Sequence, residues 1–192
     1  MSAVVQTLTR IKIGLEGLPP GLLQGGKGLM EADEGNKRPP RRTADEEARL
    51  RAHWMKNGKG DQLCIPWVML YNSLCFAAGD FKFRGAKKMG AVVAATVSSE
   101  QDKIPLGTNK FETFAEYCRV PPRTGAMVKL GRPLIRKWAC EFVIVVDAEM
   151  YQAEVLKDIF THAGKMVGIG CWRPSLKGPY GRFVVTKFEV QK

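Results

Sequence analysis

The sequence is poor in the residues on which metal sites and disulfide frameworks depend. It has only two histidines, His53 and His162, and its five cysteines include no CxxC pair. Structural zinc sites take closely spaced Cys and His ligands, so we expect no metal site. An odd number of widely spread cysteines is also unlike a disulfide framework. We therefore expect reduced thiols and an intracellular protein.

Long apolar runs and acidic charge are also scarce. No uncharged apolar run reaches the roughly 18 residues of a membrane-spanning helix, and the amino terminus lacks the features of a signal peptide. The 30 Lys and Arg residues outnumber the 19 Asp and Glu, for a formal charge of +11. Such an excess attracts polyanions. Nucleic acid is the expected partner, and a solvated basic surface or an anionic membrane is the alternative.

The first half of the chain predicts one strand and two helices separated by a long loop. Residues 4–14 are rich in β-branched side chains and predict a strand with a basic face. Residues 15–42 carry prolines, glycines and a basic run, and predict a loop. The capping box of Thr43 and Glu46 predicts a helix over about 44–56, with His53 and Trp54 on it. From Ile65-Pro66 to Gly79 an apolar sequence predicts a central core helix, closed by a left-handed glycine.

The second half predicts strands flanking one more helix. The apolar run at 91–97 favours a strand, and residues 111–147 predict further strands with a break at 121–125. Asp147 is the expected cap of a helix with an apolar stripe, and Gly164 its expected end. Residues 182–190 alternate and predict a closing strand. The order indicates one α+β domain of the ferredoxin-like type, with helices on one face of an antiparallel sheet and insertions at 15–60 and 98–133.

The most informative segment runs from Gly168 to Phe183, with the sequence GIGCWRPSLKGPYGRF. Its glycines allow the main chain to approach a phosphate closely, and its three cations supply charge. Trp172 and Tyr180 offer flat faces to bases. The segment lacks the GxxxxGK[ST] pattern of nucleotide hydrolases and the strand–helix order of a Rossmann fingerprint. The alternative is a glycine-rich hairpin with Trp172 in the core.

Two motifs carry a resemblance to a known superfamily. The segment 168–183 resembles the carboxy-terminal glycine-rich loop of the repeat-associated mysterious proteins (RAMPs), which include CRISPR backbone and processing subunits. The Ile65-Pro66 helix start is similar to another RAMP segment, although Trp67-Val68 replaces the usual Gly-Ser. The carboxy-terminal pattern also resembles that of small phage-encoded proteins of RAMP character. The resemblance covers chiefly residues 60–79 and 130–189.

The resemblance implies an RNA recognition motif-like core in the cytoplasm of a prokaryote or of a phage-infected host. We expect a non-catalytic protein without cofactor that binds single-stranded RNA, or DNA, and acts in a homo-oligomer or a CRISPR-type complex. The alternatives are a viral inhibitor or structural protein that mimics a CRISPR subunit, and an endoribonuclease that uses His53 or His162. The residues expected to contact nucleic acid are Arg10, Lys12, Lys37, Arg38, Arg41, Arg42, Arg84, Lys87, Lys88, Gly168, Gly170, Trp172, Arg173, Lys177, Gly178, Tyr180, Gly181 and Arg182.

Overall fold

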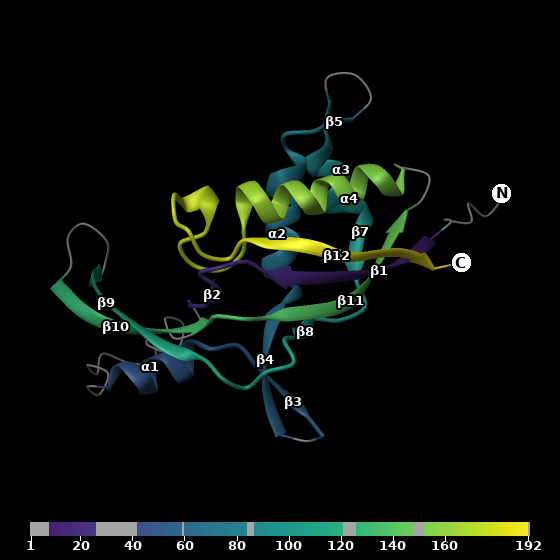
Figure 1. Cartoon of the computed structure of the whole chain (residues 1–192). Helices are drawn as coiled ribbons and strands as arrows, with labels where there is room; N and C mark the ends of the chain where they lie inside the picture. The colour runs from purple at the N-terminus through teal and green to yellow at the C-terminus, as the bar shows by residue number, and fades with distance from the viewer. Residues whose placement is uncertain are drawn as a thin grey trace, which may run out of the picture.

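A four-stranded antiparallel sheet forms the centre of the computed structural model, which describes residues 8–25, 42–58, 60–83, 87–120, 126–147 and 152–191 (Figure 1). The elements in chain order are β1 (Leu8–Gly17), β2 (Leu22–Leu23), α1 (Ala44–Arg51), β3 (Trp54–Asn57), β4 (Gly60–Pro66), α2 (Trp67–Ala78), β5 (Lys82–Phe83), β6 (Lys87–Lys88), α3 (Met89–Thr96), β7 (Val97–Ser99), β8 (Lys103–Pro105), β9 (Glu112–Val120), β10 (Ala126–Ile135), β11 (Ala139–Asp147), α4 (Ala153–His162), the π-helical turn η3 (Ala163–Val167), the 3-10 turn η4 (Pro174–Leu176) and β12 (Phe183–Gln191).

The strand order of the central sheet is β12-β1-β11-β7, with every neighbouring pair antiparallel. The chain passes through α2 between β1 and β7, and through α4 between β11 and β12. In each case another strand of the sheet lies between the two that are connected, which is the split βαβ arrangement. The predicted α+β, ferredoxin-like class is therefore confirmed.

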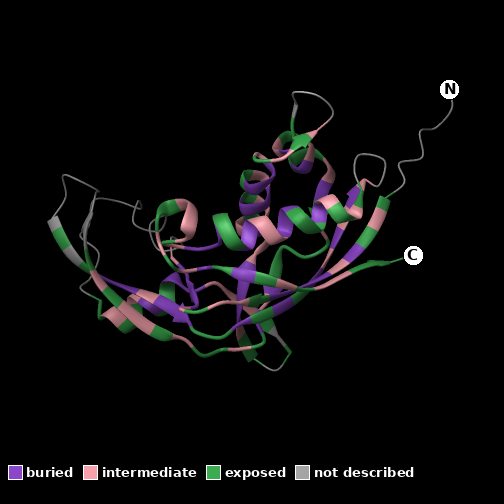
Figure 2. Ribbon diagram, turned by 45° about the horizontal axis from the view of Figure 1, so that its top comes forward, coloured by how far each residue is buried: buried purple, intermediate pink, exposed green. Residues whose placement is uncertain are grey.

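Alternation along the strands gives the sheet one buried and one open face. Ile11, Ile13 and Leu15 of β1 are buried, whereas Arg10 and Lys12, which alternate with them, lie on the open face. Burying such side chains stabilises the fold by about 1.5–3 kcal/mol each. Figure 2 shows the buried residues gathered where α2 and α4 meet the sheet. The apolar stripe predicted for the last helix thus faces the core.

The helix predicted over 44–56 is shorter than expected. Its capping box is present, with Thr43 accepting from the Glu46 amide, but α1 ends at Arg51. Ala52 is extended, His53 lies outside any regular element and Trp54 begins β3, so the prediction that both His53 and Trp54 lie on the helix is wrong. The His53 amide donates to Oε1 of the buried Gln24, 3.0 Å away. Tertiary pairing here overrides local helix propensity.

The apolar run at 91–97 is mainly helical, contrary to the predicted strand. Helix α3 covers Met89–Thr96. Only Val97, the last residue of the apolar run, belongs to a strand, β7. Alanine favours helix, and α3 packs on α2, where the Tyr71 hydroxyl donates to the Ala94 carbonyl over 2.9 Å. When an apolar run has no clear period, its hydrophobic pattern does not distinguish a buried helix from a buried strand.

Three helix-end assignments also differ from expectation. Asp147 ends β11, where it pairs with Leu8, and the N-cap of α4 is Gln152. Gly164 lies inside η3, and Gly168 at φ 70° ends it instead. Gly79 ends α2 as predicted, but in right-handed geometry at φ −61°. Long-range contacts decide where helices stop, because Gly164 presses directly against the carbonyl of Phe183.

A second layer extends from one end of the central sheet. Strands β9 and β10 form a long hairpin that pairs with β2 near its base, and α1 packs on β10, where Glu47 Oε2 accepts from the Gly131 amide at 2.9 Å. Figure 1 shows this hairpin projecting beyond the sheet on the side where the yellow segment containing η4 turns. The candidate site lies at this end.

Candidate nucleic-acid interface

The segment 168–182 forms a tightly braced loop where β1 ends and β12 begins. Main-chain bonds fasten it to the segment around β2: the Cys171 amide donates to Leu23 over 2.8 Å, and the Gly181 amide donates to Gly21 over 2.9 Å. The Ile169 amide donates to Gly181 across the loop at 2.9 Å. The loop therefore presents its side chains from a fixed frame.

The glycines of this loop are required by close packing of the loop against itself and β2. A Cβ on Gly178 would overlap the carbonyl of Trp172, and one on Gly181 would overlap the carbonyl of Ile169. Gly181 also adopts φ 73°, which is costly for other residues. The space that we expected a phosphate to enter beside these two glycines is thus filled by the protein's own main chain.

Three aromatic rings from two elements meet at the loop surface. Phe114 of β9 lies 5.8 Å from both Trp172 and Tyr180, measured between ring centroids, and Trp172 lies 6.4 Å from Tyr180. Trp172 remains 44% exposed, so the alternative that placed it in the core is wrong. Phe114 was not predicted from the sequence. Its place became visible only through the pairing of β9 with β10, which sets Phe114 opposite Arg132.

A largely buried ion pair lies where the hairpin meets the glycine-rich loop. Nε of Arg132 donates to Oε1 of Glu116 over 2.7 Å, and the two side chains are 18% and 9% exposed. Nη1 of Arg132 donates to Sγ of Cys171 over 3.0 Å. A Cβ on Gly25 would approach that Nη1 to 2.7 Å. Arg132 therefore ties the hairpin to the glycine-rich loop.

The loop's cations differ in how far they are already engaged. Arg173 is used internally, since its Nε donates to Ser175 Oγ at 2.9 Å and its Nη1 to the Gly170 carbonyl at 3.2 Å. Lys177 and Arg182 are exposed, and neither has an ion-pair partner within the described ranges. Lys177 projects from the turn after η4, with φ 61°. These two side chains are available to an anion.

The basic residues at the other end of the sheet are paired with carboxylates. Arg10 bonds Glu100 and Lys12 bonds Glu141, each at 2.6 Å. The hydrogen bond with Glu141 and its charge raise the pKa of Lys12, and the bond from Lys12 lowers the pKa of Glu141. Both cations are thus largely neutralised by neighbours on the open face.

The strand register also separates the two basic sets. Arg182 directly precedes β12, whereas Gln191, which ends β12, pairs with Arg10. At about 3.3 Å per residue the two arginines lie roughly 25 to 30 Å apart. Figure 1 shows the yellow loop and the amino-terminal end of β1 at opposite ends of the sheet. The single groove that we expected to join Arg10 and Lys12 with the loop cations is therefore not formed.

The remaining predicted contacts lie elsewhere or outside the described residues. Arg42 is exposed just before the cap of α1, and Lys88 is exposed at the start of α3. Lys87 pairs with Phe83 in the short β5–β6 ribbon. Four predicted residues lie outside the described ranges: Lys37, Arg38, Arg41 and Arg84.

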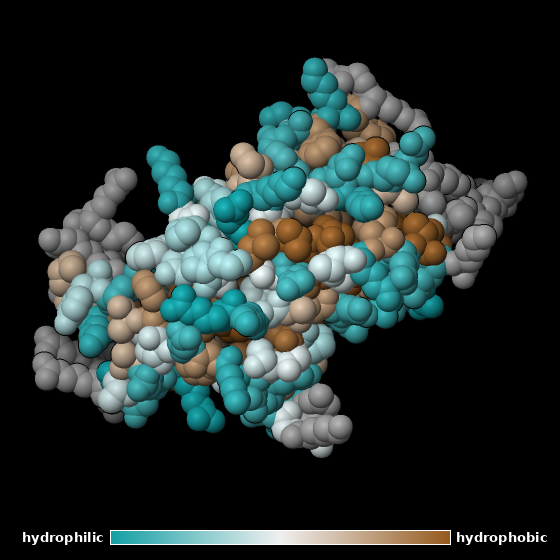
Figure 3. Space-filling view, in the orientation of Figure 1, coloured by the Kyte–Doolittle hydropathy of each residue, from teal (hydrophilic) through white to brown (hydrophobic). Residues whose placement is uncertain are grey.

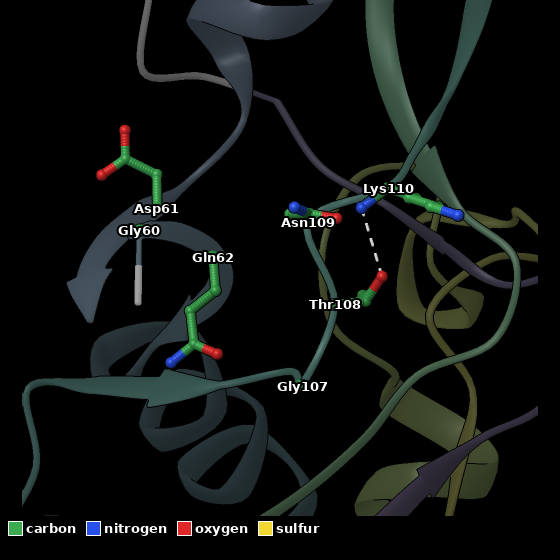
Figure 4. A pocket seen from close by; sticks show the side chains of 7 residues that line it. All are labelled: Gly60, Asp61, Gln62, Gly107, Thr108, Asn109 and Lys110. Atoms are coloured by element: carbon green, nitrogen blue, oxygen red, sulfur yellow. Dashed lines mark hydrogen bonds between the residues drawn. The ribbon is translucent and has the colours of Figure 1, made fainter. Parts of the chain in front are cut away.

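A polar hollow of about 530 Å³ opens between the start of β4 and the segment after β8. Its lining residues are Gly60, Asp61, Gln62, Gly107, Thr108, Asn109 and Lys110. Figure 4 shows Asp61 directed away from Asn109 across the hollow, and the Lys110 amide bonded to the Thr108 hydroxyl at 3.1 Å. The side chains do not converge on a common point in the hollow.

The two histidines occupy different surroundings. His162, at the end of α4, contacts Oδ2 of Asp80 at 2.8 Å and packs edge-on against Phe81, so it joins the ends of α2 and α4. His53 precedes β3, and its carbonyl accepts from the Cys64 amide at 2.9 Å. Within the described ranges, no three His, Cys, Asp or Glu side chains gather as a metal site would require, and no helix combines the length and apolarity needed to cross a bilayer.

An apolar band lies apart from the loop. Figure 3 shows brown side chains crossing the face over β12 and the start of β1, with hydrophilic side chains on both sides. On β12 the partly buried Val185 and Phe188 and the exposed Val190 lie on the same face as Ile11, Ile13 and Leu15, whereas the exposed Leu8 and Val184 lie on the open face. Exposed apolar patches on soluble proteins mark contact surfaces for other molecules.

Comparisons with known proteins support the fold. No family model matches the chain, and no curated protein matches it by sequence. Among solved structures, the chain is similar to one in a cryo-EM structure of the Type III-B Cmr-β complex bound to cognate target RNA, with a TM-score of 0.55 and 12% identity. The match covers 96% of this chain and 61% of the other. At this identity the likeness concerns the fold, and it agrees with the ferredoxin-like core expected of RAMPs.

Proposed function

We propose that this protein binds single-stranded RNA without cleaving it, at the end of the central sheet where the glycine-rich loop meets the β9–β10 hairpin. The observation that carries the proposal is the presence of two exposed cations, Lys177 and Arg182, that have no ion-pair partner among the described residues and lie on a braced loop with an exposed tryptophan. Cations of this kind bind phosphates, and aromatic rings accept bases. The structural neighbour comes from an RNA-bound complex, which favours RNA over DNA.

The glycines act indirectly in this proposal. Gly168, Gly170, Gly178 and Gly181 allow the main chain of the loop to pack closely, and that packing orients the neighbouring side chains. A rigid frame reduces the conformational entropy lost on binding. We propose that the protein acts either as a homo-oligomer along RNA or as a subunit of a CRISPR-type complex.

A binding role suits the surroundings of the histidines better than catalysis does. A general base must reach the proton that it removes, within about 3 Å or through one water. The Nε2 atom of His162 is engaged by Asp80, in a contact that joins two helix ends. His53 lies between strands that its main chain links. The contact with Asp80 gives His162 a structural role, and the main chain of His53 links two segments of the fold.

Binding can be measured by fluorescence anisotropy with a labelled single-stranded RNA and the same RNA in a duplex. We expect tighter binding of the single strand and a linear loss of log affinity with log salt, at a slope of about −0.7 for each phosphate contacted. For two to four contacts the slope lies between about −1.4 and −2.8. Absence of binding to any oligonucleotide at low salt would overturn the proposal.

A second candidate is a protein that docks onto another protein, as an inhibitor or structural subunit does. The apolar band over β12 and the start of β1 favours it, because nucleic acid does not call for such a surface. Val190→Thr, on the helix-covered face of β12, distinguishes the two functions, with Val184→Thr on the open face as the control. Loss of co-purifying CRISPR subunits with unchanged RNA binding would indicate a protein partner at this band.

A further inference from the structure

We propose that the indole of Trp172 is a stacking site for one unpaired nucleobase, held in place by Phe114 and Tyr180. This inference rests on the proposed function and deepens it, since it names the part of the nucleic acid that the loop recognises. Phosphate contacts alone do not distinguish a single strand from a duplex, whereas a stacking site requires a base that has left its pair.

The backbone at Trp172 is the first observation. Trp172 has φ 48°, and in the described ranges only Lys177 is another non-glycine residue with positive φ. This conformation is unfavourable for a bulky side chain and persists only where the surroundings impose it. Here the Tyr180 amide donates to the Trp172 carbonyl over 3.0 Å, and Gly178 leaves room for that carbonyl. The loop thus holds a tryptophan outward in strained geometry.

The exposure of the ring is the second observation. Tryptophan carries a large apolar surface, and most of it is normally buried. The 44% of Trp172 that stays exposed lies beside two rings that restrain it, Phe114 at an interplanar angle of 74° and Tyr180 at 42°. Restraint by neighbours with continued exposure is the arrangement that a preorganised stacking surface needs.

The surrounding charge is the third observation. Arg132 of the hairpin, which pairs with Phe114, is occupied by Glu116 and Cys171. Lys177 and Arg182 lie in the same loop without ion-pair partners in the described structure. A base on Trp172 therefore leaves its phosphates near free cations, as in single-strand binding surfaces that combine aromatic rings with positive charge.

The experiment compares Trp172→Leu and Trp172→Phe with the matched control Leu176→Ala, which removes an exposed apolar side chain from the same loop. We expect Trp172→Leu to weaken single-stranded RNA binding about 5- to 150-fold, the range for loss of one stacked base. Trp172→Phe keeps a flat ring and is expected to lose less than about fivefold, and Leu176→Ala less than twofold.

A second measurement does not depend on the folding of any variant. The wild-type protein is titrated with RNA in which abasic sites replace the bases and all phosphates remain. We expect wild-type affinity to fall by a factor similar to that caused by Trp172→Leu, with no further loss when variant and abasic RNA are combined. Equal binding of normal and abasic RNA by the wild type would overturn the stacking site and leave the proposed function standing. Failure to bind either RNA would instead overturn the proposed function.

Discussion

The two ends of the central sheet carry cations of the same kind in opposite electrostatic states. At the amino-terminal end of β1, Arg10 and Lys12 each contact a carboxylate at 2.6 Å. At the loop end, Lys177 and Arg182 have no such partner among the described residues. An exposed pair contributes little to stability, but it largely cancels the field of both groups. Local pairing, more than the total charge of +11, indicates where an anion binds.

The ends also differ in how their backbone is held. The loop end depends on left-handed glycines pressed against neighbouring main chain, whereas the far end is regular antiparallel ladder. Ladder pairing tolerates many side chains. The loop tolerates few side chains at its glycine positions. It also combines residues of positive φ with an exposed tryptophan in one short segment. Strain of this kind is commonly found at binding sites.

The largest expected effect is the loss of stability caused by disrupting the close packing of the glycine-rich loop. Gly181→Ala places a Cβ against the Ile169 carbonyl at φ 73°, and we expect a loss of about 3 kcal/mol in the free energy of unfolding. Thermal unfolding should shift down by roughly 6 to 12 °C. Gly58→Ala is the control, because no atom lies within 4 Å of the added Cβ. Equal melting temperatures for both variants would contradict the close packing described.

Neutralising two cations at either end tests the contrast directly. Lys177→Gln with Arg182→Gln removes two free charges, and Arg10→Gln with Lys12→Gln removes two paired ones. We expect the first double variant to lose about tenfold in RNA affinity and to flatten the salt slope by about 1.4. The second should lose less than threefold. Equal losses, measured by anisotropy at several salt concentrations, would mean that affinity follows net charge alone.

Freeing the paired cations tests the separation of the two ends. Glu100→Gln with Glu141→Gln releases Arg10 and Lys12 without altering them. Short RNA that covers only the loop end should bind as before, and RNA long enough to span roughly 25 to 30 Å should gain about two- to fivefold. A gain that is the same for short and long RNA would place the two sets closer together than the register indicates.

The smallest expected effect concerns the carboxylate at the far end. The hydrogen bond and charge of Lys12 hold the pKa of Glu141 below its ordinary value of 4.5. The stabilisation from this ionised group is therefore present above pH 4.5 and is lost as pH falls through the lower folded-state pKa. Carboxyl-detected NMR titration should show the lowered pKa of Glu141 in the wild type and a higher pKa in Lys12→Gln, where the charge of Lys187 still lowers it. Glu46, whose pKa is lowered by the Thr43 amide, serves as the unaffected control.

Local sequence signals predicted the longer elements, which are β1, α2, β9, β10, β11, α4 and β12, but placed some of their limits wrongly and missed most of the short ones. The capping box of Thr43 and Glu46 and the apolar helix from Trp67 to Ala78 are both present. The run at 91–97 was assigned to a strand, because an apolar sequence without a period does not reveal how it packs. The end of α4 was misplaced because Gly164 is buried against Phe183, a contact between residues distant in the chain.

The candidate site was predictable only in part for the same reason. Residues 168–183 stand out by their glycine, aromatic and basic content, so Trp172, Tyr180, Lys177 and Arg182 were identified from the sequence. Phe114 and Arg132 were not, because only the pairing of β9 with β10 brings them to the loop. The partners of Arg10 and Lys12 were equally hidden, since Glu100 and Glu141 belong to other strands or follow them.

The sequence by itself determined the α+β class, the apolar core helix, and a glycine-rich segment whose residue types suit phosphates and bases. These properties follow from periodicity and residue chemistry, which act over a few neighbouring positions. Only the tertiary structure decided which cations are free, which aromatic rings meet, and that Trp172 faces outward. Those outcomes depend on strand register and on contacts between residues that are far apart in the chain.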